Sequence, residues 1–206
     1  IVQKEDITEN GIKYIKQDGS VGYYQTVNKT TPVAGDVKYV DRNGDGVVDD
    51  NDRDIIGNPN PDFTYGFQTK VSWKSLSLSA SFNGVQGRDI LNVGNRYNNT
   101  PGTKSNNVTR KAFQNMWTDE NPSNLYPKST FVVQNMVMDR YVEDGSYLRC
   151  YDITLSYILP AKWTNKIGIK NTSVYASVKN AFVITDYSGY DPEVNSFAFD
   201  GLRPGV

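Results

Sequence analysis

The chain has 206 residues, of which 37% are hydrophobic and 12% aromatic, and its formal net charge is −1. The lack of a basic block argues against nucleic acid as a partner. The sequence contains no His, which excludes Ser–His and Cys–His catalytic pairs and His-ligated zinc within this chain. Its single cysteine, Cys150, allows no internal disulfide, and its place in a strand-like run indicates a small packing residue rather than a nucleophile.

No stretch of the sequence approaches the ~18 consecutive apolar residues of a transmembrane helix. Spanning β-strands are not excluded by this, because their alternating side chains escape hydropathy windows. The chain begins at Ile1, without Met or a signal peptide. We therefore expect it to be a piece of a longer protein.

An acidic loop at residues 41–52 has the spacing of a calcium-binding loop. Its expected ligands are Asp41, Asn43, Asp45, Val47 (through the backbone carbonyl), Asp49 and Asp52. Gly46 permits the sharp turn that such a loop needs. Asp52 stands where Glu is usual, and its shorter side chain should weaken the site. The alternative is an acidic solvent-exposed turn that binds no metal.

The residues around this loop do not favour the paired helices of a calcium sensor. The preceding run, DVKYV, is β-prone, and Gly57, Pro59 and Pro61 disfavour a long helix after the loop. The sequence therefore predicts that calcium acts as a structural clip rather than as a switch.

Four segments alternate between apolar and polar residues, as β-strands do. They are residues 63–73, 76–83, 147–159 and 172–183, and the turn at Lys74 and Ser75 joins the first two into a β-hairpin over residues 63–83. In the third segment, strict alternation places Arg149 and Tyr151 with Ile153 and Leu155, and Leu148 and Cys150 with Asp152 and Thr154. Each segment has about the length of a tilted membrane-spanning strand.

Long and short connections alternate between these strands. Residues 1–62, 84–146 and 184–206 are expected to be external loops, with residues 147–183 forming two barrel strands and a short link. The loop at 84–146 should contain a short helix at residues 108–117, capped by Asn106 or Asn107. This arrangement favours an antiparallel transmembrane β-barrel segment, although a soluble antiparallel sandwich gives the same alternation.

A barrel would divide the side chains of the hairpin between lipid and lumen. The residues expected to face lipid are Tyr65, Phe67, Val71, Leu78 and Ala80. Those expected to face a wet lumen are Gln68, Lys70, Ser77 and Ser79.

The runs GDVKYVDRNGDGVVDDNDRDIIGNPNPDFTYGF, FNGVQGRDILN, YVEDGSYLRCYDITLSYILP and VYASVKNAFVITDYSGYDPEV resemble the C-terminal barrel region of SusC-like TonB-dependent transporters of Bacteroidota. The resemblance covers most of residues 35–195. It implies an all-β fold, as part of a barrel of about 22 strands in the cell outer membrane. The resemblance implies that further strands follow in the family, so the segment 184–206 is expected to stop before the final strand or strands.

The resemblance also implies a function and partners. The whole transporter would import oligosaccharides or peptides with a SusD-like surface lipoprotein, driven by the TonB complex through an N-terminal region outside this sequence. The alternative is a secreted, calcium-stabilised β-sandwich that binds carbohydrate. An enzyme is the weakest interpretation, because the carboxylate pair Asp191 and Glu193 lies in a generic turn pattern.

Overall fold

The computed structural model describes residues 1–99, 107–129, 137–169 and 172–193, and the chain divides into two compact units. Unit 1 consists of Ile1–Ile56 and Asn92–Tyr141. Unit 2 consists of Gly57–Leu91 and the chain from Val142 onward. Each unit is therefore assembled from two segments that are separated in the sequence.

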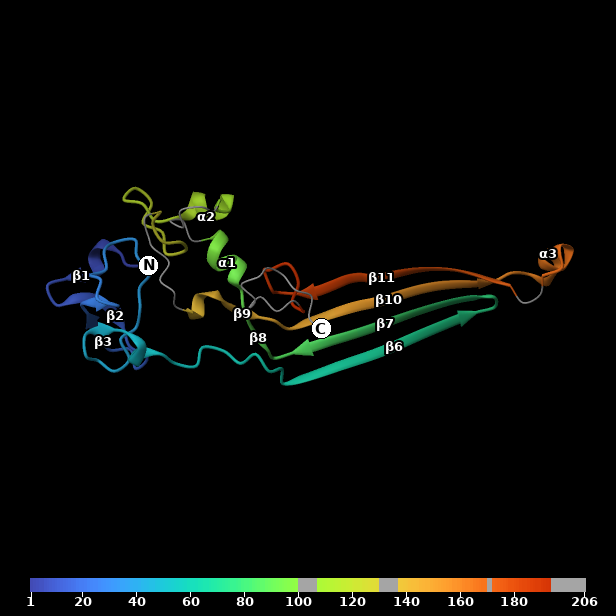
Figure 1. Cartoon of the computed structure of the whole chain (residues 1–206), viewed down its shortest axis with the longest axis horizontal. Helices are drawn as coiled ribbons and strands as arrows, with labels where there is room; N and C mark the ends of the chain where they lie inside the picture. The colour runs from blue at the N-terminus through green and yellow to red at the C-terminus, as the bar shows by residue number, and fades with distance from the viewer. Residues whose placement is uncertain (100–106, 130–136, 170–171, 194–206) are drawn as a thin grey trace. The chain divides into compact units, whose positions relative to one another are not determined.

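A four-stranded antiparallel sheet in the order β11-β10-β7-β6 forms the body of unit 2 (Figure 1). Its strands are β6 (Phe63–Trp73), β7 (Leu76–Gln86), β10 (Tyr147–Ile158) and β11 (Ser173–Thr185). The predicted hairpin is confirmed, and Lys74 takes a left-handed conformation (φ 54°) in its turn. The second strand runs beyond its predicted end at Asn83 because its pairing with β6 continues to Gln86.

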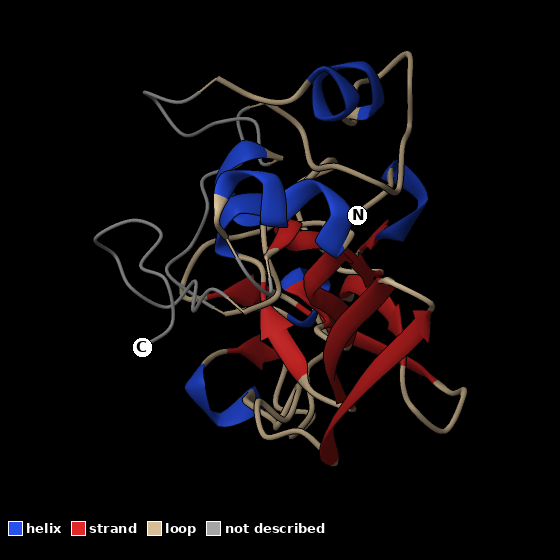
Figure 2. Cartoon of the chain, turned by 90° about the vertical axis from the view of Figure 1, so that its right-hand side faces the viewer, coloured by secondary structure: helices blue, strands red, loops and turns tan. Residues whose placement is uncertain are grey.

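Shorter elements lie at the two ends of this sheet (Figure 1), and Figure 2 shows the helices and strands of the chain in separate colours. Beyond β7 and β10, β8 (Asp89–Leu91) pairs antiparallel with β9 (Val142–Asp144). The link between β10 and β11 contains α3 (Ala161–Thr164) and the 3-10 turn η4 (Asn165–Ile167). The backbone N–H of Ile158 donates to the carbonyl of Ser75 (2.8 Å), so this link lies at the same end of the sheet as the β6–β7 turn.

One face of the sheet is apolar and the other is polar. The cross-strand pairs Val71–Leu78 and Leu78–Leu155 lie on the apolar face, whereas Lys70 pairs with Ser79 on the polar face. Val71 is 64% exposed and Leu78 is 47% exposed. A sandwich would bury the apolar face under a second sheet. Within the described residues of unit 2, no second layer covers it, and this counts against the sandwich interpretation.

A β-bulge interrupts the alternation of β10. Cys150 pairs with Phe82, and Asp152 pairs with Ser81, the next residue of β7. Tyr151 is therefore an extra residue in β10. An extra residue inverts the side-chain alternation on one side of it.

The bulge corrects the predicted faces of the first residues of β10. Leu148 and Cys150 lie on the apolar face, and Arg149 lies on the polar face; the prediction that Arg149 shares a face with Ile153 is wrong. Cys150 is fully buried between its cross-strand partners Phe82 and Phe182, whose ring centroids are 6.3 Å apart. Its predicted role as a packing residue is confirmed.

The first segment of unit 1 has a small core of its own, made by Val2, Ile12, Tyr14, Tyr24, Val27 and Val48. Its regular elements are η1 (Lys4–Asp6), β1 (Ile7–Thr8), β2 (Gly11–Ile15), β3 (Val21–Tyr24), β4 (Thr26–Val27), β5 (Val47–Val48) and η2 (Asp50–Asp52). β1, β2 and β3 form an antiparallel sheet, and β4 pairs with β5 in parallel. The hydroxyl of Tyr24 accepts from the backbone N–H of Tyr39, and burial raises the pKa of Tyr24 to about 12.

The second segment of unit 1 contains α1 (Val93–Asn98), α2 (Arg110–Asn115) and η3 (Asp139–Tyr141). The predicted helix at residues 108–117 is present as the shorter α2. Its cap is Thr109, which accepts from the N–H of Ala112, and not Asn107. The other predicted cap, Asn106, lies outside the described residues. No prediction anticipated α1.

Direct contacts join the two segments of unit 1. The indole N–H of Trp117 donates to Gln3 (3.0 Å), and the amide of Gln3 donates to Asn124 (2.8 Å). Lys128 donates from its backbone N–H to the carbonyl of Gly35 (2.9 Å) and pairs through Nζ with Asp36. The two regions predicted as separate external loops therefore share one compact unit.

Candidate functional site

The loop at residues 41–52 lies in unit 1 and is closed by its own side chains. Asp41, which is only 3% exposed, accepts from the backbone N–H groups of Gly44 (2.7 Å) and Gly46 (2.8 Å). Asp52 accepts from the N–H groups of Arg42 (2.7 Å) and Asp49 (2.8 Å). Gly46 has φ 84°, so the sharp turn predicted at this glycine is present.

The remaining predicted side-chain ligands accept hydrogen bonds from backbone N–H groups in the middle and at the end of the loop. Asn43 accepts from the N–H of Asp45 (2.9 Å), and Asp45 accepts from the N–H of Val47 (2.8 Å). Asp49 accepts from the N–H of Asn51 (2.7 Å) and caps η2. All five predicted side-chain ligands thus bind backbone amides of one loop.

The fit of this loop to a cation is partial. A carboxylate has about four acceptor positions, so these side chains keep lone pairs beyond those given to the amides. No cluster of three or more acidic, His or Cys side chains suited to a metal occurs among the described residues. Calcium at this loop stays a prediction.

Tyr14 attaches the loop to the core of unit 1. Its hydroxyl donates to the backbone carbonyl of Asp41 (2.6 Å), and its ring is 2% exposed. Burial, together with the nearby charges of Asp41 and Asp52, raises the pKa of the Tyr14 phenol. The phenol therefore remains a neutral donor at physiological pH.

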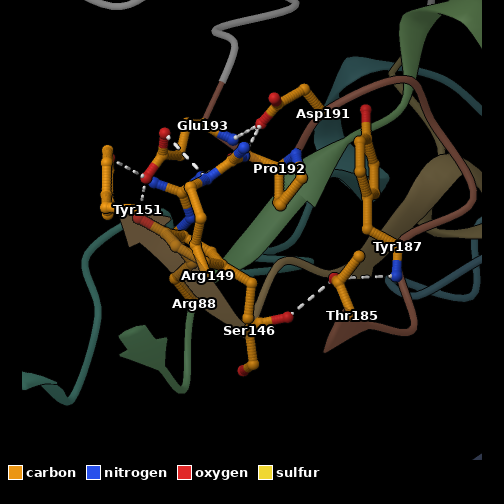
Figure 3. Close-up of polar contacts among 10 residues, drawn as sticks. Arg88, Ser146, Arg149, Tyr151, Thr185, Tyr187, Asp191, Pro192 and Glu193 are labelled. Carbon is orange, nitrogen blue, oxygen red and sulfur yellow. Dashed lines mark hydrogen bonds and ion pairs between the residues drawn. The ribbon is translucent and has the colours of Figure 1, made fainter. Parts of the chain in front are cut away.

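A second polar site lies on the polar face of unit 2, around Arg149 (Figure 3). The guanidinium of Arg149 donates to Asp191 (2.6 Å), and its Nε lies 3.3 Å from a carboxylate oxygen of Glu193. Arg149 is only 7% exposed. The inverted alternation at the bulge brings this side chain onto the polar face.

Three further groups hold the residues that follow β11 against this face. The hydroxyl of Tyr147 donates to Glu193 (2.6 Å). The hydroxyl of Tyr151 also donates to Glu193 (2.8 Å), and Arg88 donates to the backbone carbonyl of Pro192 (Figure 3). We call Arg88, Tyr147, Arg149, Tyr151, Asp191 and Glu193 the arginine clasp. It ties the segment 186–193 to β10 and leaves both carboxylates in ion pairs rather than available as an acid–base pair.

The arginine clasp was missed in the sequence, although one signal was present. Strict alternation placed the charge of Arg149 on a face otherwise occupied by Ile153, Leu155 and Tyr157. A charge on a lipid-facing surface is costly. That conflict was the sign that the alternation is broken nearby.

No helix among the described residues is long and apolar enough to cross a membrane. No family model matches the chain. Over 175 residues the chain is 34% identical to TonB-dependent receptor P26 of Formosa agariphila, covering 82% of this chain and 17% of that receptor. Over 165 residues it is 34% identical to TonB-dependent receptor SusC of Bacteroides thetaiotaomicron, covering 77% of this chain and 15% of that receptor.

The chain is also similar to solved structures of a peptide transporter. The RagAB peptide transporter matches with a TM-score of 0.54 and 30% identity, over 64% of this chain and 14% of the other. The RagAB peptide importer in its closed-closed state matches with a TM-score of 0.57 and 25% identity, over 87% of this chain and 18% of the other.

The single-layered sheet with its two unlike faces and the similarity to these receptors define the class as TonB-dependent receptors, which reside in the outer membrane and are transporters rather than enzymes. Within that class, the chain belongs to the SusC/RagA-like receptors. It spans between 15% and 19% of the length of the curated relatives that it matches.

Proposed function

We propose that the four long strands of unit 2 are neighbouring strands of a closed outer-membrane β-barrel. Their apolar face would lie against lipid and their polar face toward the lumen. The observation that carries this proposal is the sheet itself, whose two faces differ in character and whose apolar face stays largely exposed within the described residues of unit 2. In a membrane, lipid stabilises the apolar face, and the missing neighbouring strands pair the open edges of β6 and β11.

The whole receptor would import oligosaccharides or peptides with a SusD-like surface lipoprotein, energised by the TonB complex. The similarity to the RagAB peptide transporter supports a peptide substrate and a two-protein assembly. Oligosaccharides stay the other proposed substrate class, because the sequence resemblance to SusC-like transporters implies both. Uptake of labelled peptides and labelled oligosaccharides by cells that carry the receptor, with and without its lipoprotein, separates the two classes.

Lipid contact tests the barrel orientation. A photo-crosslinker at Val71 or Leu78 of the complete receptor should form adducts with acyl chains, whereas one at Ser79 should not. In the same background, Val71→Arg and Leu78→Arg should each lower the amount of folded receptor, with Ser79→Arg tolerated. Both apolar sites lie three positions from the β6–β7 turn, so each cost should be smaller than the about 2–4 kcal/mol of a charge at the bilayer midplane. Adducts at Ser79 equal to those at Val71 would contradict the orientation.

Calcium binding by residues 41–52 is a second proposal, supported by the ligand spacing and by the gathering of all five side chains around one loop. We expect an affinity of roughly 10⁻⁴ to 10⁻³ M, as in extracellular modules. Isothermal titration of the complete receptor should lose one calcium-binding heat on Asp41→Ala/Asp45→Ala. The control Glu9→Ala/Asp18→Ala removes two exposed carboxylates elsewhere in unit 1. Equal heats in all three proteins would exclude the site.

A further inference from the structure

The end of the sheet at the β6–β7 turn is unusually basic. Lys74 lies in the turn itself, and Lys162 and Lys166 lie in the link that contains α3 and η4. All three side chains are exposed. We call this region, residues 73–76 together with residues 157–169, the turn end.

Among the described residues, no carboxylate forms an ion pair with these lysines. The sequence has no Asp or Glu between Asp62 and Asp89, and none between Asp152 and Asp186. The turn end therefore carries an uncompensated positive charge, although the whole chain has a net charge of −1.

Two of the three tryptophans of the chain lie at the same end. Trp73 is 69% exposed and Trp163 is 63% exposed, whereas Trp117 is packed inside unit 1 at 8% exposure. The ammonium group of Lys74 lies over the Trp73 ring, 4.8 Å from its centre. Trp73 pairs with Leu76 at the last position of the β6–β7 ladder, so this aromatic–lysine pair marks the edge of the apolar face.

This combination fits one class of ligand. Tryptophan rings partition to the depth of lipid headgroups, where one part of the ring is apolar and the indole N–H is wet. Lysines extending from that depth attract phosphate groups of anionic lipids, and each such charge strengthens binding near the membrane surface. We propose that the turn end binds the phosphate headgroups of anionic phospholipids in the membrane leaflet at the short-turn side of the barrel.

This inference rests on the proposed function, because it needs the apolar face to lie in lipid. It goes further by assigning a preference for anionic headgroups to one end of the sheet. Contact between the apolar face and acyl chains does not require such a preference. The polar residue Lys70 is not part of the site, because it lies on the polar face opposite Ser79.

The test uses the complete receptor in vesicles of equal parts phosphatidylglycerol and phosphatidylcholine. A photo-crosslinker replaces Trp163, and mass spectrometry measures the ratio of the two lipids among its adducts. A crosslinker at Phe67, in the middle of β6 on the apolar face, gives the reference ratio for unselective acyl contact. We expect phosphatidylglycerol to be enriched several-fold at position 163 relative to position 67, and the enrichment to fall as salt is raised.

The triple variant Lys74→Gln/Lys162→Gln/Lys166→Gln should remove most of this several-fold enrichment, because it removes the charges that attract the anionic headgroup. The matched control Lys13→Gln/Lys16→Gln/Lys111→Gln, which removes three exposed lysines from unit 1, should leave it unchanged. Lipid adducts at Phe67 without enrichment at position 163, or equal enrichment in the triple variant, would overturn the inference and leave the barrel proposal intact. Absence of lipid adducts at both positions would overturn the barrel proposal as well.

Discussion

Arg149 and its two carboxylate partners differ in their access to water. The side chain of Arg149 is 9% exposed, whereas those of Asp191 and Glu193 are 34% and 29% exposed. A charge left without a partner costs most where water cannot reach it. Removal of the arginine and removal of the two carboxylates should therefore destabilise the arginine clasp by different amounts.

Removal of the carboxylates should be the more damaging change. Asp191→Asn/Glu193→Gln leaves the buried guanidinium unpaired, and we expect a cost of about 3–5 kcal/mol. Arg149→Met leaves two carboxylates that water can reach and should cost less, and the triple variant should recover part of the loss. Hydrogen exchange of residues 186–193 in the complete receptor measures the local opening. A larger effect from Arg149→Met than from the double variant would contradict this account.

Among the strands, the cross-strand pair of Tyr65 and Gly84 joins an aromatic ring to a glycine. A Cβ at Gly84 would overlap the Tyr65 ring and approach the carbonyl oxygen of Tyr147 to 2.7 Å. At Gly66, in the adjacent strand, the nearest atom to an added Cβ is the carbonyl oxygen of Phe82, at 3.4 Å. The two glycines therefore differ in how much they tolerate a side chain.

Gly84→Ala should destabilise the receptor by about 1–3 kcal/mol, because the Tyr65 ring has to leave its place over the strand. Gly66→Ala should change stability by less than about 0.5 kcal/mol and provides the matched control. The midpoint of urea unfolding of the purified receptor measures both. Equal shifts for the two variants would show that the ring over Gly84 does not account for the need for glycine there.

The strands could be predicted from the sequence because their side chains alternate over long runs, and β6 occupies the predicted residues 63–73. Alternation assigns faces only as long as no residue is inserted, so the bulge at Tyr151 could not be found from the period alone. The calcium-type spacing identified a real loop, but spacing does not show whether its oxygens bind amides or a metal. α1 was missed because its six residues include Gly94 and two asparagines, which are weak helix formers.

For the whole molecule, short and long connections define two sides of the membrane in the proposed barrel. An epitope inserted at Gly19, in an open turn of unit 1, should be reached by antibody on intact cells. An epitope inserted between Lys74 and Ser75 should be reached only after the outer membrane is permeabilised. Equal labelling of both epitopes on intact cells, at matched receptor levels, would contradict the proposed topology.

The contents of unit 1 could not be predicted from the sequence, for a physical reason. Its decisive contacts join residues that are far apart, such as Gln3 with Asn124 and Gly35 with Lys128. Patterns within a window report only local structure. Two regions whose sequences each lack a regular pattern can therefore form a single packed unit.

The division of unit 1 between two segments also affects which recombination events between receptor genes would keep this unit intact. The β6–β7 hairpin interrupts the chain between Ile56 and Asn92, so recombination on one side of the hairpin transfers only half of the unit. A graft of the first segment alone would bring a foreign residue opposite Trp117, whose indole donates to Gln3. Transfer of unit 1 between receptors therefore requires both segments to be inherited together with the β6–β7 hairpin that lies between them in the chain.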